Sequence, residues 1–265
     1  MGFGNKGASG GNAMIYKRVA ARLKAQDWLA ITIELTIVVI GVFIGTWVAN
    51  WNQERAAQRD TRALLLELGP EMATQKHNVK ATRDYFFATQ RYADTAFAGW
   101  RRDPNVTDSQ FVIAAYQASQ ATGLDANGQS WTTIFGGDQL RRIKDPAIRA
   151  PLQRLMTFEY SILSYRMMLT RYRDDVRRII PSDIQQSIRK SCGDQLDSSG
   201  MTLSLPATCA IELPAAAAVA ATLRAHPDLI SELAQHQSAV ASQLLNLDLF
   251  EAHVDALDRG IANLD

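Results

Sequence analysis

WLAITIELTIVVIGVFIGTWV, residues 28–48, has a single ionisable side chain, that of Glu34. A helix rises about 1.5 Å per residue, so this stretch covers roughly 30 Å, the thickness of a bilayer's hydrocarbon core. Trp28 lies at one end and Trp47 and Trp51 at the other, where indole rings favour the headgroup layer. The stretch therefore predicts one transmembrane helix, which we place at residues 28–51.

A cleaved signal peptide is the alternative for an apolar segment near the N-terminus. The run is longer than the roughly 7 to 15 apolar residues of a signal peptide. Cleavage after Ala49 would also put Trp47 where a small residue is required. We therefore expect an uncleaved membrane anchor.

Charged residues near the span predict its orientation. Before it stand Lys6, Lys17, Arg18, Arg22 and Lys24 against Asp27, and after it Arg55, Arg59 and Arg62 mix with Glu54 and Asp60. The positive-inside rule then places the N-terminus in the cytoplasm. We expect residues 1–27 to be a flexible basic cytoplasmic tail and residues 52–265 to be periplasmic, in a bacterial inner membrane.

One face of the predicted span carries a carboxylate and two glycines. Steps of three and four residues align Glu34, Val38, Gly41, Gly45, Val48 and Asn52. Gly41 and Gly45 have the small-xxx-small spacing that lets two helices approach closely. We interpret the six residues as a helix-pairing stripe, which would also reduce the energetic penalty of Glu34 in the bilayer. In the alternative, Glu34 is neutral or reaches the cytoplasmic boundary.

The composition restricts the remaining possibilities. The chain has 265 residues, with 28 Lys and Arg against 27 Asp and Glu, so its charge of +1 favours no nucleic-acid partner. Its 2 cysteines exclude a disulfide-rich miniprotein and a four-cysteine zinc module. With 47% hydrophobic residues, most of the chain is expected to fold.

Beyond the span, apolar residues recur with a helical period. Residues 71–101 place Met72, Val79, Phe86, Ala93, Phe97 and Trp100 on one face, after a break at Gly69-Pro70. In 146–180 the repeats are Ile148, Leu155, Ile162, Leu169 and Val176, with Phe158, Tyr165, Tyr172 and Ile179. Near the C-terminus they are Leu233, Val240, Leu247, Val254 and Ile261, with Phe250, Leu257 and Leu264. These patterns predict long helices, although Pro151 suggests a break near Ala150.

The fold class that follows is all-α. We expect the N-terminal transmembrane helix to continue into a periplasmic antiparallel bundle of three or four long helices. Shorter helices over residues 109–122 and 214–224 are expected as accessory elements. No segment has the alternation of a convincing strand.

The two cysteines lie in a segment with loop composition. Cys192 and Cys209 lie within SCGDQLDSSGMTLSLPATCA, residues 191–210, which contains Gly, Ser and Pro. An oxidising compartment permits a disulfide between them, and closing such a loop adds about 3 kcal/mol by chain entropy. We predict this disulfide; the alternative is two unrelated thiols.

The span and its exit resemble a known family. IELTIVVIGVFIGTWVANWNQER, residues 33–55, is similar to a family of bacterial single-span inner-membrane proteins with a helical domain of unknown function. That family has an I-E-x-x-x-V-x-x-G-V-x-x-G core followed by N-W-N-E. WTTIFGGDQLRRIKDPAIRAPLQRL, residues 131–155, resembles a second block, with Gln53 and Pro151 as departures. The resemblance implies the topology and helical content, and it assigns no catalytic residue.

No catalytic, cofactor-binding or metal-ligating residue is predicted. His77, His226, His236 and His253 have no zinc-type spacing, and we interpret them as solvated or rim residues. Asp174 and Asp175 among arginines are typical of a solvated helix face. The chain has no GxSxG, P-loop or GxGxxG motif.

These observations favour a non-enzymatic function. The leading hypothesis is a single-pass scaffold or accessory subunit that acts through its periplasmic bundle and helix-pairing stripe. Its partners would be the lipid bilayer and a second copy or another membrane or periplasmic protein. The alternative is a ligand-sensing bundle that signals through a partner's transmembrane helix, and an envelope enzyme ranks third.

Overall fold

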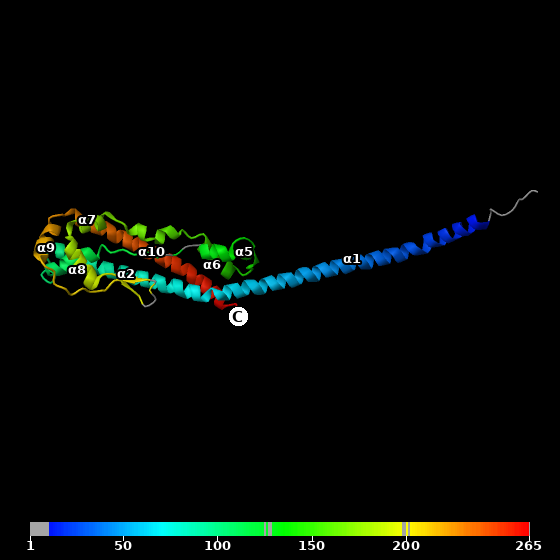
Figure 1. The fold of residues 1–265 in the computed structure, drawn as a ribbon, viewed down its shortest axis with the longest axis horizontal. Helices are drawn as coiled ribbons and strands as arrows, with labels where there is room; N and C mark the ends of the chain where they lie inside the picture. The colour runs from blue at the N-terminus through cyan, green and yellow to red at the C-terminus, as the bar shows by residue number, and fades with distance from the viewer. Residues whose placement is uncertain (1–10, 125, 127–128, 198–199, 201, 265) are drawn as a thin grey trace, which may run out of the picture. The chain divides into compact units, whose positions relative to one another are not determined.

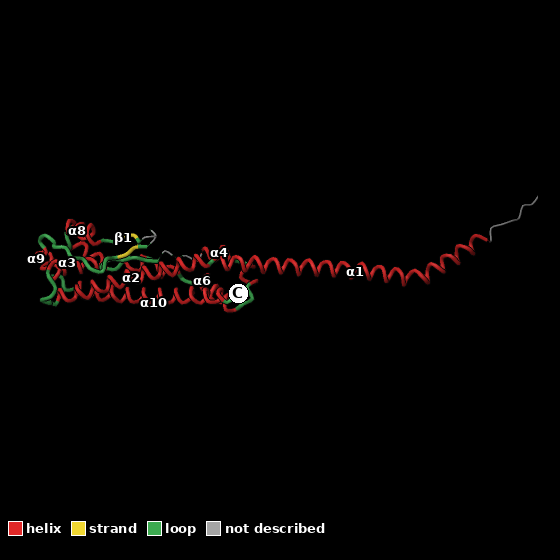
Figure 2. Tube along the Cα trace, turned by 90° about the horizontal axis from the view of Figure 1, so that it is seen from below, coloured by secondary structure: helices red, strands yellow, loops and turns green. Residues whose placement is uncertain are grey.

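The computed structural model describes residues 11–124, 126, 129–197, 200 and 202–264. The chain divides into two compact units, residues 1–60 and 61–265, and each is described by itself. The described residues are mostly helical, as the sequence predicts, and strands are limited to one short pair (Figures 1 and 2).

The first unit is formed by most of α1 (Gly11–Glu67). A window of 18 residues in this helix has a mean hydropathy of 2.3, and none of it is buried. The helix is therefore long and apolar enough to cross a membrane. It begins at Gly11, so residues 11–27 are helical rather than a flexible tail. Good helix formers such as Ala, Lys, Arg and Leu in this segment account for the difference. Residues 1–10 lie outside the described part.

The second unit is built on two long antiparallel helices, α2 (Gly69–Trp100) and α10 (Asp228–Ala262) (Figure 1). Lys76 of α2 pairs with Asp255, whereas Arg83, two turns later, pairs with Asp248, so the helices run in opposite directions. Only Leu68 separates α1 from α2, as Gly69-Pro70 predicts. The compact unit begins at Thr61, and residues 52–60 are mostly exposed.

Shorter elements cover the long pair. They are α3 (Asp108–Gln117), α4 (Gln129–Phe135), α5 (Asp138–Arg142), α6 (Pro146–Met156), α7 (Arg171–Ile179), α8 (Ser182–Cys192) and α9 (Ala216–Arg224). Strands β1 (Gln195–Leu196) and β2 (Leu203–Ser204) pair antiparallel. A capping box, in which Thr107 and Gln110 bond each other's backbone N–H, fixes the start of α3.

The predicted long helix over residues 146–180 is wrong. After α6 the chain makes two 3-10 turns, η1 (Tyr160–Leu163) and η2 (Tyr165–Met168), before α7 begins. Local bonds compete with the helix here: the Glu159 carboxylate accepts from the Ser161 N–H. Leu163 and Met168 are therefore buried, whereas Leu169, predicted in the core, is 53% exposed. The bundle has two long helices instead of three or four.

Pro151 does not interrupt α6, although the sequence suggests a break there. Proline has no N–H, so the helix leaves the Ala147 carbonyl without its usual donor. Gly260 of α10 lies against this carbonyl, and a Cβ at Gly260 would approach the oxygen to 2.7 Å. The two helices therefore approach closely at this turn, which favours glycine at residue 260.

Candidate functional site

The helix-pairing stripe lies on one uninterrupted helix. Glu34, Val38, Gly41, Gly45, Val48 and Asn52 all fall within α1. At 100° per residue they lie within a narrow sector of the helix surface. Apart from the helix's own neighbouring backbone, no described atom would lie within 4 Å of a Cβ added at Gly41 or Gly45. The stripe is therefore open for a second helix to approach.

The threonine hydroxyls within residues 28–51 are bonded to the helix itself. The hydroxyls of Thr32 and Thr36 each donate to the carbonyl four residues earlier, at 2.6 Å. Thr46 donates to the carbonyl of Val42 at 3.0 Å. Hydrocarbon offers no hydrogen-bond partners, so this internal bonding suits a lipid environment.

The exit of the span carries stacked aromatic rings. Trp47 and Trp51 stack with ring centroids 6.3 Å apart, and the Arg55 guanidinium lies 3.8 Å from the Trp51 ring centroid. An indole pair next to a cation is typical of the boundary between hydrocarbon and headgroups. The stacked rings and the guanidinium lie at the end of the apolar segment of α1.

The cysteines are joined in the structure. A disulfide links Cys192, at the end of α8, to Cys209, with the Cα atoms 5.7 Å apart. The Gln117 side chain donates to the Cys192 carbonyl at 2.5 Å and so ties the bridge to α3. The loop between the cysteines contains the β1–β2 pair. The bridge thus fastens an otherwise loop-rich segment to the helices.

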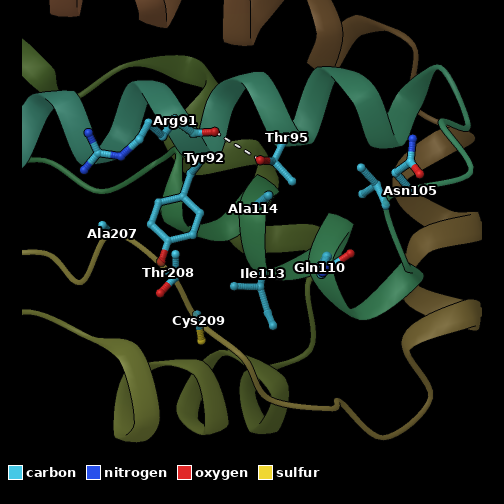
Figure 3. Close-up of a pocket in the computed structure, with 11 residues that line it drawn as sticks. Arg91, Tyr92, Thr95, Asn105, Gln110, Ile113, Ala114, Ala207, Thr208 and Cys209 are labelled. Carbon is cyan, nitrogen blue, oxygen red and sulfur yellow. Dashed lines mark hydrogen bonds between the residues drawn. The ribbon is translucent and has the colours of Figure 1, made fainter.

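A groove lies beside this disulfide, between α2, α3 and residues 206–209 (Figure 3). Its volume is about 420 Å³, which is within the usual range for small-molecule pockets. Ile113 and Ala114 contribute apolar surface, and Thr208 and Gln110 contribute polar groups. The Tyr92 hydroxyl donates to the Pro206 carbonyl at 2.8 Å and fixes one wall. Arg91 adds a positive charge to the lining, so the groove can admit a small polar molecule, but it contains no nucleophile with an adjacent base.

Buried polar groups gather where α7 meets α10. His236 is fully buried, so the prediction of a solvated or rim histidine is wrong for this residue. Its Nδ1 lies 2.7 Å from the Thr170 hydroxyl, and its Nε2 has no partner. One turn earlier on α10, Glu232 is 8% exposed and bonds the Arg171 guanidinium at 3.0 Å.

The environment shifts the pKa values of both groups. Burial, and then the charge of Arg173, lower the pKa of His236 to about 4. Burial and the neighbouring Asp175 raise the pKa of Glu232. His236 is therefore a neutral imidazole at pH 7, and its Nδ1 is bonded to the Thr170 hydroxyl in the core.

Acidification is expected to destabilise the second unit through His236. An unfolded histidine titrates near pH 6.5, so between about pH 6.5 and 4 the unfolded chain binds more protons than the folded one. The stabilisation is complete above about pH 6.5, and up to about 3 kcal/mol is lost as the pH falls towards 4. The raised pKa of Glu232 acts in the opposite direction.

Denaturant unfolding of wild type and His236→Gln across this pH range measures the effect. The wild type should lose more stability than His236→Gln, whereas His226→Gln, at an exposed position of the same unit, should follow the wild type. Parallel curves for wild type and His236→Gln would contradict the assignment.

No three His, Cys, Asp or Glu side chains in the described part of the chain lie close enough together to hold a metal ion. Comparisons with protein-family models, with curated proteins and with solved structures find no match for this chain. The similarity to the bacterial single-span family stays a prediction from residues 33–55 and 131–155.

Proposed function

We propose that this chain is a single-pass inner-membrane protein that acts as a scaffold or accessory subunit, with its helical domain in the periplasm. The observation that carries the proposal is the exposed apolar surface of α1 over residues 28–51. Soluble proteins rarely expose so large a continuous apolar surface to water. Lipid would cover this surface, and the internally bonded threonines are consistent with that environment.

The orientation follows from the charges that flank the span. The basic residues of the 1–27 segment would remain in the cytoplasm, as the positive-inside rule requires. The disulfide between Cys192 and Cys209 supports a domain in the oxidising periplasm. Two independent features therefore favour the same topology.

A scaffold function requires contact surfaces, and two features of the chain supply them. In the membrane, the helix-pairing stripe would join two copies of the chain or a copy and a partner's helix. On the domain, Leu245 and Leu249 lie one turn apart on α10 and are 68% and 48% exposed. Exposed leucines at this spacing support contact with a protein partner. The ligand-sensing alternative rests on the groove of Figure 3.

Replacing Gly41 and Gly45 together by isoleucine is expected to abolish association of the span in a bilayer. Branched side chains at both positions would hold the backbones apart and remove the close packing that drives pairing. A membrane reporter assay of self-association, or crosslinking of the full chain, measures this result.

The matched control changes two residues on the opposite face, Thr36→Ile with Phe43→Ile, and should leave association unchanged. Both double variants should insert equally, because both spans stay apolar. If the glycine variant associates as strongly as the wild type, the stripe has no function in pairing.

A further inference from the structure

Three arginines converge beside the C-terminal end of α3. Arg173 and Arg177 lie one turn apart on α7, and Arg189 comes from α8. The Tyr116 hydroxyl lies 3.4 Å from Nη1 of Arg177 and 3.3 Å from Nη1 of Arg189. Two guanidinium groups thus share one phenol oxygen, which is a neutral acceptor. We call Arg173, Arg177 and Arg189 the arginine cluster.

The cluster has no carboxylate partner among the described residues. The other arginines of α7 are paired: Arg171 bonds Asp175 and Glu232, and Arg178 bonds Asp175. The cluster's own acceptors are uncharged, namely the Ser119 carbonyl for Arg173 and the Gln120 side chain for Arg177. The partial negative charge at the end of α3 offsets only a fraction of three full charges.

Arg177 is the most constrained member. Its Nε is buried and has no hydrogen-bond acceptor. Its guanidinium lies 4.8 Å from the centroid of the Tyr116 ring, and that tyrosine is fully buried. Burial, with the charges of Arg173 and Arg189, lowers the pKa of Arg177. Like charges gathered around a half-buried guanidinium with an unused N–H donor are unfavourable unless an anion joins them.

We propose that the arginine cluster binds a dianionic phosphate group, such as that of a phosphate monoester. Guanidinium forks match phosphate oxygens in bidentate geometry. Positive charges supplied by two different helices suit a tetrahedral anion with several oxygens better than one planar carboxylate. Arg189 is exposed, so a ligand has access from solvent. The inference is independent of the helix-pairing stripe, because it uses only α3, α7 and α8.

Isothermal calorimetry tests the proposal. Inorganic phosphate is titrated into the full chain in neutral phosphatidylcholine nanodiscs, and chloride at matched ionic strength is the reference. We expect saturable binding of one phosphate with a Kd below about 1 mM. Arg177→Gln and Arg189→Gln should each weaken it at least about tenfold, the usual effect of losing a charge-assisted bond. Arg189→Gln keeps the test valid if Arg177→Gln fails to fold, because the Arg189 side chain is exposed.

The matched control is Arg178→Gln, one residue along α7, whose arginine pairs with Asp175. This variant should bind phosphate like the wild type. Equal weakening in all three variants would indicate a general charge effect and overturn the proposal, as would the absence of saturable phosphate binding. Binding to phosphatidylglycerol vesicles without binding to free phosphate would also overturn it, because a lipid phosphodiester carries a single charge.

Discussion

Replacing Phe250 by alanine is expected to lower the free energy of unfolding of the second unit by about 3 to 5 kcal/mol. Phe250 is fully buried on α10. Its ring contacts those of Phe158 and Tyr160, with centroids 5.4 and 5.8 Å away. Truncation would remove the apolar transfer energy and both aromatic contacts, and would leave a cavity that α10 cannot close. Denaturant titration of the full chain in a mild detergent measures the loss.

The neighbouring residue provides the control. Leu249 is 48% exposed, and Leu249→Ala should change the free energy of unfolding by less than about 0.5 kcal/mol. Similar values for the two variants would mean that the α10 face that includes Phe250 does not form the core. The comparison therefore tests which face of α10 packs against Tyr160 of η1.

The second large effect is expected at the disulfide. Replacing Cys192 and Cys209 together by alanine should lower the free energy of unfolding by about 3 kcal/mol, because the bridge spans 17 residues. Loss of the bridge also frees one wall of the groove, since Cys209 lies on its lining. Proteolysis within residues 193–208 should therefore become faster than elsewhere in the domain.

Reduction of the wild type supplies a check that changes no residue. A reductant should lower the stability of the wild type towards that of the double variant, and should leave the variant itself unaffected. If reductant changes neither protein, the two cysteines are free thiols in the purified chain.

The period of the apolar residues predicts the two long helices correctly. In α2, Met72, Val79 and Phe86 are buried, and in α10 Leu233, Val240, Leu247 and Val254 are buried. Both apolar patterns extend over many helical turns, so local exceptions do not hide the period. The apolar window in α1 is equally clear, because almost every residue in it is apolar.

The segment between α6 and α7 shows where this method fails. Ile162 and Leu169 continue the seven-residue repeat, but the chain there forms 3-10 turns. No glycine or proline marks the interruption. Local side-chain bonds accompany it: the Glu159 carboxylate accepts from the Ser161 N–H, and the Thr157 hydroxyl donates to the Gln153 carbonyl. Such bonds stabilise the non-helical turns by small energies. The period of the apolar residues carries no information about these energies.

The apolar pattern of the sequence does not predict the buried polar residues of α10 or the arginine cluster, for two different reasons. His236 and Gln243 lie seven residues apart, in the same register as Phe250 and Leu257, so the repeat in α10 could have placed both in the core. A pattern of apolar residues alone does not contain these two polar members of the register. The arginine cluster has no such signal, because Tyr116 and Arg189 approach Arg177 only through tertiary packing.

The central claim is that residues 28–51 cross the membrane once and place the helical domain on the outside of the inner membrane. Protease treatment of intact spheroplasts, with antibodies against an N-terminal tag and against the domain, tests it most directly. We predict that residues 61–265 are digested from outside while the N-terminal tag stays protected and membrane-bound. A domain that is protected until the cells are lysed, or recovered in the soluble fraction, would contradict the claim.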